Sequence, residues 1–85
     1  MKRFTVEILK QVKTGQLEIA GRNCLDSILV GDELAVEGRP DSVVRVTGIV
    51  VYRKDVLELY HGYVGTLFVT RISGDDPRLE DVLIS

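Results

Sequence analysis

The side chains with the most potential for chemistry gather in two short stretches of the second half of the chain. Aromatic rings beside cations can stack on the bases of single-stranded nucleic acid. Tyrosine and arginine are also frequent at the energetic centres of protein interfaces. A third interpretation is structural, with the rings covering an open end of the fold and the cations in solvent. The six candidate residues are Tyr52, Arg53, Lys54, Tyr60, His61 and Tyr63.

The remaining reactive side chains do not form a catalytic set. His61 is the only histidine, and its neighbours Tyr60 and Gly62 suit a turn. Catalysis by histidine needs a nucleophile or a carboxylate positioned beside it, and the sequence does not point to one. Cys24, the only cysteine, is interpreted as a packing or turn residue. We therefore expect a protein that is not an enzyme.

Patterns for metals, cofactors and nucleotides are missing as well. One cysteine and one histidine do not supply the ligands of a usual zinc site. The acidic pairs, such as Asp32-Glu33 and Asp75-Asp76, lack the spacing of an EF-hand loop. No Gly-rich loop ending in Gly-Lys-Ser/Thr is present to hold phosphates. We expect no metal, no cofactor and no bound nucleotide.

Length and charge limit the class of protein and of partner. The 85 residues form one expected domain, 1–85. A single cysteine, the absence of a secretory signal and the lack of a long apolar run predict a cytoplasmic protein that does not enter membranes. The net charge is -2, whereas dedicated nucleic-acid-binding domains are usually basic. A protein or ribonucleoprotein partner is therefore favoured over RNA alone, and the sequence does not indicate the oligomeric state.

The elements that must position these side chains are short strands, because apolar and polar residues alternate along much of the chain. Phe4, Val6 and Ile8 are expected on one inward face, and Leu17 and Ile19 on another. The segment Val56–Tyr60 fits either a strand or one helical turn. The other expected strands cover Phe4–Ile8 with a continuation or bend to Lys13, Gln16–Ala20, Ile28–Val30, Leu34–Val36, Val43–Tyr52, Tyr63–Ile72 and Val82–Ile84.

Turn signals separate these strands. Gly38–Ser42 is the clearest turn, and His61-Gly62 is a second one. Gly48 within a β-branched run predicts a bulge or bend, and Leu79 is expected to contact the core. Short strands with turns every eight to twelve residues predict an all-β fold. A small closed antiparallel β-barrel of about six strands, with Greek-key connections, fits best because closure removes exposed sheet edges.

Five pieces of the chain, in order, resemble the β-barrel second domain of translational GTPases such as elongation factor Tu. The resemblance covers nearly the whole chain and implies a barrel of the translation-protein type, here without its GTPase. The matching pieces are Gly15–Arg22, the Val-Gly-acidic run within Ile28–Leu34, Tyr52-Arg53-Lys54, Val64-Gly65 and Val82-Leu83.

The sequence departs from that family where the family holds the aminoacyl end of its ligand. Val50 stands in place of an acidic residue, and Tyr63 stands in place of an asparagine. Glu80-Asp81 replaces the glycine before the last strand. The resemblance therefore implies the barrel but not the aminoacyl site.

Two functional hypotheses follow. The first is a non-catalytic binding module that docks on a protein or ribonucleoprotein partner. The alternative is a small acidic inhibitor or immunity-type protein that neutralises one specific protein, a hypothesis that rests on the size, the acidity and the missing catalytic set.

Overall fold

A computed structural model describes residues 1–85 and consists of strands, turns and loops. It contains no helix long and apolar enough to cross a membrane. The strands are β1 (Arg3–Lys13), β2 (Gln16–Asn23), β3 (Ile28–Leu29), β4 (Glu33–Val36), β5 (Arg39–Val51), β6 (Lys54–Val56), β7 (Glu58–Leu59), β8 (Val64–Ser73) and β9 (Val82–Ile84).

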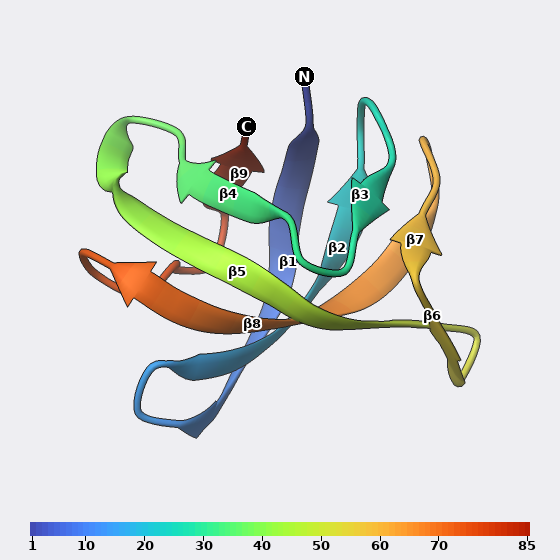
Figure 1. The fold of residues 1–85 in the computed structure, drawn as a ribbon, viewed down its shortest axis with the longest axis horizontal. Coiled ribbons are helices and arrows are strands. Elements are labelled where there is room, and N and C mark those ends of the chain that lie inside the picture. The colour runs from blue at the N-terminus through green and yellow to red at the C-terminus, as the bar shows by residue number, and fades with distance from the viewer.

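Six of the strands close into an antiparallel barrel (Figure 1). Their order around the ring is β4-β9-β1-β2-β8-β5, and the pairing of β4 with β5 closes it. Strand β2 pairs with β8, and β9 lies between β1 and β4. Several neighbouring strands in the barrel are therefore far apart in the sequence. The predicted closed barrel of about six strands is confirmed.

Three very short strands lie on one side of this barrel. Strand β6 folds back antiparallel beside the last three residues of β5, and β3 pairs with β7 as a separate two-stranded ribbon. The segment Val56–Tyr60 thus contains the end of β6 and all of β7, so the strand alternative is confirmed and the helical turn is wrong.

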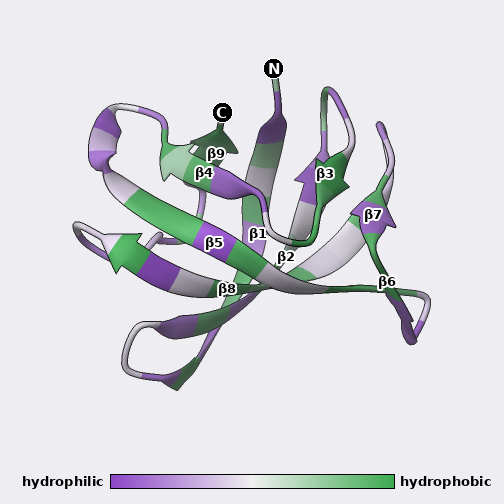
Figure 2. Cartoon of the chain, in the orientation of Figure 1, coloured by the Kyte–Doolittle hydropathy of each residue, from purple (hydrophilic) through white to green (hydrophobic).

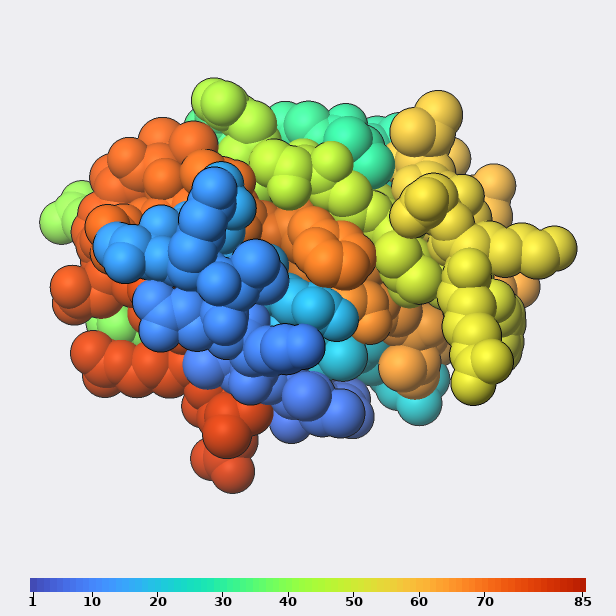
Figure 3. Space-filling model, turned by 90° about the horizontal axis from the view of Figure 1, so that it is seen from below, coloured from blue at the N-terminus to red at the C-terminus, as the bar shows by residue number.

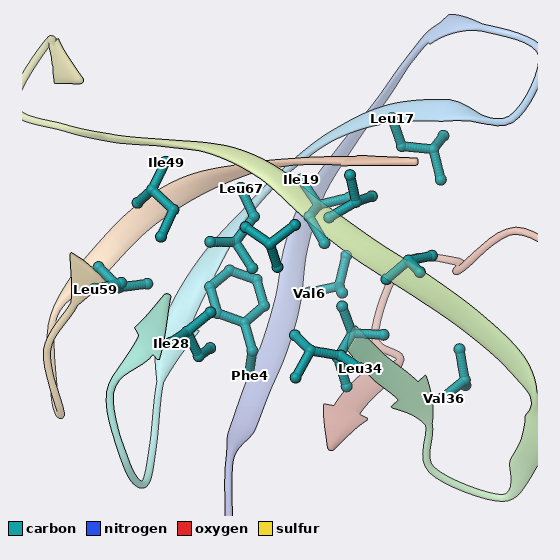
Figure 4. Packing of buried hydrophobic residues seen from close by; sticks show 14 residues of the cluster. Phe4, Val6, Leu17, Ile19, Ile28, Leu34, Val36, Ile49, Leu59 and Leu67 are labelled. Carbon is teal, nitrogen blue, oxygen red and sulfur yellow. The ribbon is translucent and has the colours of Figure 1, made fainter. Parts of the chain in front are cut away.

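The core is one cluster of aliphatic side chains around Phe4. Apolar and polar residues alternate in bands along β5 and β8 (Figure 2), which places one set of side chains inside the ring. The expected inward residues Phe4, Val6, Leu17 and Ile19 are all buried. Figure 4 shows the cluster, whose 14 members are Phe4, Val6, Leu17, Ile19, Ile28, Leu34, Val36, Val44, Val46, Ile49, Leu59, Leu67, Val69 and Leu83.

A bulge in β1 contradicts the prediction for Ile8. Val6 pairs with Gly21 and Ile8 pairs with Ala20, so Glu7 is an extra residue in the ladder. An extra residue shifts the alternation by one position. The Ile8 side chain is consequently 65% exposed, and the next residue packs against the core instead.

The predicted turn Gly38–Ser42 is also shorter than expected. Val36 pairs with Arg39, so the turn consists of Glu37 and Gly38, and β5 has already begun at Arg39. The ladder is irregular directly after this turn, where Pro40 cannot donate a backbone hydrogen bond. Of the predicted turn residues, Gly38 lies in the turn, and residues 39–42 form the irregular start of β5.

Two further predictions have opposite outcomes. Val46 pairs with Val69 and Gly48 with Phe68, so a bulge does interrupt β5 at Gly48, as expected. Leu79, which was expected to contact the core, is 56% exposed. Pro77 is the buried residue of that loop instead.

Candidate functional site

Residues Tyr60–Tyr63, here called the aromatic turn, are fastened to the end of β2 by Asn23. The Asn23 backbone N–H donates to the Tyr63 carbonyl (3.0 Å), and its carbonyl accepts from the Gly62 N–H (2.7 Å). The fully buried Asn23 side-chain amide donates to the Leu59 carbonyl at 2.7 Å. Because a buried polar group needs its partners, these bonds fix where the aromatic turn lies.

The two residues before Asn23 complete this attachment. The Arg22 guanidinium donates to the Gly62 carbonyl at 2.7 Å. At Gly21 the strands approach so closely that a Cβ atom would lie 1.7 Å from the Thr5 carbonyl oxygen. The Gly-Arg pair that contributed to the family resemblance is thus structural here, since it brings β2 against β1 and holds the aromatic turn.

Tyr60 and Tyr63 form an exposed pair on this turn. Their ring centroids are 6.0 Å apart at an interplanar angle of 72°, which is the edge-to-face arrangement that aromatic rings prefer. The side chains are 56% and 49% exposed. They border a hollow of about 100 Å³, whose other lining residues are Val51, Val56, Glu58 and Leu59.

The hairpin tip between β5 and β6 carries the rest of the predicted site. Val51 pairs with Lys54, so Tyr52 and Arg53 form a two-residue turn. Both residues have positive φ angles, 51° and 64°, as tight hairpin turns require, although neither is a glycine. The Tyr52 side chain is 87% exposed at the tip.

The structure therefore divides the six predicted residues into two groups. Tyr60 and Tyr63 line the hollow, and His61 is exposed on the same turn. The hairpin tip 52–54 lies beyond the hollow, and no hydrogen bond or ion pair joins it to the aromatic turn. Strands β6 and β7 separate the two groups along one side of the barrel (Figure 1).

Sequence reasoning did not select three further residues near this site. Leu57, which precedes β7, and Val64, which directly follows the aromatic turn, are 77% and 51% exposed. Asn23 was not among the predicted site residues, yet it is fully buried and its side chain holds the Leu59 carbonyl. A signal for Asn23 existed, because it continues the inward alternation of Leu17 and Ile19 along β2.

One carboxylate near the aromatic turn has a shifted pKa. Asp26 accepts a hydrogen bond from the N-terminal ammonium at 2.7 Å, and this bond and the attraction of that charge lower the pKa of Asp26 below 3.8. Lys2 and His61 add smaller contributions in the same direction. The Asp26 carboxylate and the N-terminal ammonium therefore form an exposed ion pair near the aromatic turn.

A second hollow, of about 500 Å³, lies away from the predicted site. It is formed by β1, β2, β5 and β8, and includes Lys10, Gln16, Thr47, Phe68 and Thr70. No group of three or more histidine, cysteine or acidic side chains is arranged to hold a metal ion.

Comparison with known proteins gives a match in fold alone. No family model matches the sequence, and no curated protein matches it. Among solved structures, the apo form of the translation elongation factor SelB from Methanococcus maripaludis matches with a TM-score of 0.85 at 18% identity. The match covers 99% of this chain and 18% of the SelB chain, so the protein spans a small part of that factor's length. The resemblance in sequence is thereby confirmed at the level of fold: the chain has the barrel fold of a segment of a translation elongation factor.

Proposed function

We propose that this barrel is a non-catalytic binding module that docks on a protein surface, either of a single protein or of the protein part of a ribonucleoprotein. The docking surface consists of the aromatic turn and the apolar side chains beside it. The likeness to a segment of SelB supports a translation-factor-like module. The observation that carries the proposal is the exposed tyrosine pair held in place beside an apolar hollow.

Fixed aromatic side chains favour binding because little conformational freedom is lost when a partner arrives. The backbone of the aromatic turn is already held by Asn23 and Arg22, and the edge-to-face contact restrains both rings. Tyrosine presents an apolar ring and a polar hydroxyl, which suits a surface that is wet when free and covered when bound. The turn therefore has the character of an interface hot spot.

The size and chemistry of the hollow favour a protein partner. Sites for small molecules usually enclose about 300–1,000 Å³, whereas this hollow measures about 100 Å³. It suits one apolar side chain of a partner. Its one charged lining residue is Glu58, whose carboxylate would repel a phosphate backbone. Arg53 and Lys54 lie outside the hollow, where they can meet an acidic rim of the same partner.

The test is affinity capture from the source organism with quantitative mass spectrometry. Tyr60→Ala/Tyr63→Ala should lower recovery of the specific partner at least tenfold relative to the unaltered protein. Leu79→Ala is the matched control, because Leu79 and Tyr60 are equally exposed at 56% and Leu79 lies in a different loop. Recovery with Leu79→Ala should remain unchanged.

Nuclease treatment separates the possible partner classes. Recovery that survives nuclease indicates a protein, and co-recovery of ribosomal or translation components supports a ribonucleoprotein. Binding that nuclease abolishes, that falls steeply as salt rises and that weakens in Arg53→Ala/Lys54→Ala would replace the proposal with direct RNA binding. A partner retained equally by Tyr60→Ala/Tyr63→Ala and by Leu79→Ala would overturn the assignment of the surface.

A further inference from the structure

The hollow beside the aromatic turn combines a fixed apolar floor with a single carboxylate. Val51 and Val56 pack against the core cluster and Leu59 is fully buried, so the barrel itself holds this floor in place. The exposed tyrosine pair forms the border of the hollow. Glu58 contributes its only charged side chain. A ligand for this hollow therefore meets apolar surface, aromatic rings and one negative charge.

The Glu58 carboxylate has no cationic partner within the chain. Every lysine, arginine or N-terminal ammonium that forms an ion pair does so with another carboxylate. Of the carboxylates outside these pairs, only Glu18 and Glu58 are half-buried, and the others are exposed. Each of these two lines one of the two hollows of the molecule. Both hollows thus contain a partly desolvated carboxylate without an ion pair.

The surroundings of these two carboxylates differ in the cations that they offer. Glu18 pairs across the strands with Lys10, and Lys10 lines the same hollow. Glu58 pairs with Leu29 instead, and no lysine, arginine or histidine lines its hollow. A cation that meets Glu58 inside the hollow would therefore come from another molecule. Figure 3 shows the β1–β2 hairpin that carries Glu18, in blue, well apart from the hairpin tip 52–54, in yellow.

We propose that the protein partner anchors itself by inserting a basic side chain, arginine or lysine, into this hollow, an inference that rests on the docking surface proposed above. The hydrocarbon stem packs on the apolar floor, as the stems of basic residues do on other apolar surfaces. The charged head meets the Glu58 carboxylate and the tyrosine rings, whose faces attract a cation within about 6 Å. An arginine head can also stack on a ring and pair with a carboxylate through two hydrogen bonds.

Other side chains satisfy only part of this chemistry. A purely apolar side chain would fill the hollow but cover Glu58 without pairing it, and a carboxylate buried without a partner is costly. An acidic side chain would place a like charge against Glu58. A basic side chain supplies the apolar contact through its stem and the opposite charge through its head. Glu58 therefore acts as a selectivity element, because it penalises partners that lack a cation at this position.

Affinity capture with a neutral variant tests the anchor. Glu58→Gln keeps the shape of the side chain and removes its charge, so recovery of the partner should fall by about fivefold or more. Glu18→Gln is the matched control, because Glu18 is also half-buried, outside every ion pair and in the other hollow, and recovery should not change. If Tyr60→Ala/Tyr63→Ala loses the partner while Glu58→Gln retains it, the docking surface stands and the basic anchor is wrong. A partner that all three variants retain would overturn both proposals.

A second experiment needs no partner. The probes are a capped glycine-arginine-glycine peptide and its citrulline counterpart, which has nearly the same shape but no charge. At millimolar concentration and low salt, the arginine peptide should shift the NMR signals of Tyr60 and Tyr63, and the citrulline peptide should shift them far less. Glu58→Gln should remove the difference between the two peptides, and Glu18→Gln should preserve it. Equal shifts with both peptides on the unaltered protein, or none with the arginine peptide, would overturn the proposal.

Discussion

Replacing Asn23 with alanine should remove about 3–4 kcal/mol of folding free energy. The Asn23 side chain donates to the carbonyls of Leu59 (2.7 Å) and Asp26 (2.9 Å) and accepts from the Leu25 N–H (3.2 Å). A hydrogen bond contributes about 1 kcal/mol net, and a buried group left without a partner costs somewhat more. The Leu59 carbonyl would become such a group.

The loss is large compared with the total. At about 0.05–0.15 kcal/mol per residue, a chain of 85 residues has a stability of roughly 4–13 kcal/mol. With a urea m-value of about 1.5 kcal/mol/M, the urea concentration at the midpoint of unfolding should fall by about 2–3 M. Urea unfolding can be followed by circular dichroism and by tyrosine fluorescence, because the chain has three tyrosines and no tryptophan.

Two variants make this reasoning refutable. Asn23→Asp keeps nearly the same shape but cannot donate to the Leu59 carbonyl, so it should be at least as destabilised as Asn23→Ala at neutral pH. Gln16→Ala removes an amide on the same strand that makes no hydrogen bond, and it should change stability by less than about 0.5 kcal/mol. If Asn23→Asp kept the stability of the unaltered protein, the hydrogen bonds would not be what holds the turn.

Three further predictions concern the backbone and pH. Gly21→Ala should lower the free energy of unfolding by about 3 kcal/mol or more, measured by urea unfolding, because the added Cβ would lie 1.7 Å from the Thr5 carbonyl oxygen. Gly48→Ala is the control: a Cβ at Gly48 would lie 3.6 Å from the nearest atom, so this change should cost less than about 1 kcal/mol. Arg53→Gly should stabilise by about 1 kcal/mol in the same assay, because it relieves a non-glycine residue at φ 64°; an unchanged midpoint would contradict this strain. Burial raises the pKa of Asp32, but hydrogen bonds from Lys2 and from the Leu29 N–H outweigh it, and the pKa falls below 3.8. The stability from Asp32 is therefore present above about pH 4 and is lost as the pH falls through the lowered folded-state pKa, a loss that Asp32→Asn should remove from unfolding curves measured between pH 6 and 2.

Alternation was enough to predict the barrel and part of its core. Leu17 and Ile19 are buried as predicted, because their strand pairs regularly with both neighbours at those positions. Ile8 was predicted wrongly because the bulge at Glu7 belongs to the register between β1 and β2, which a local pattern does not record. Long-range register decides such positions.

The same limit applies to the candidate site. Its residue types were readable from the sequence, and His61-Gly62 is a turn as expected. The hairpin tip and the aromatic turn are separated because β6 pairs with β5 whereas β7 pairs with β3, and such strand pairing is a tertiary property. The buried role of Asn23 depends on carbonyls that lie up to 36 positions away along the chain.

The place of β9 in the ring has a consequence for the order of events during synthesis. Strands β1 and β4 are complete by residue 36, yet they are joined only by β9, whose residues are Val82–Ile84. The barrel therefore cannot close until residues 82–84 have left the ribosome. Contacts between such distant segments also slow folding in general. Until then β1 and β4 each keep the edge that β9 will cover, and the nascent chain is most exposed to mispairing just before β9 emerges.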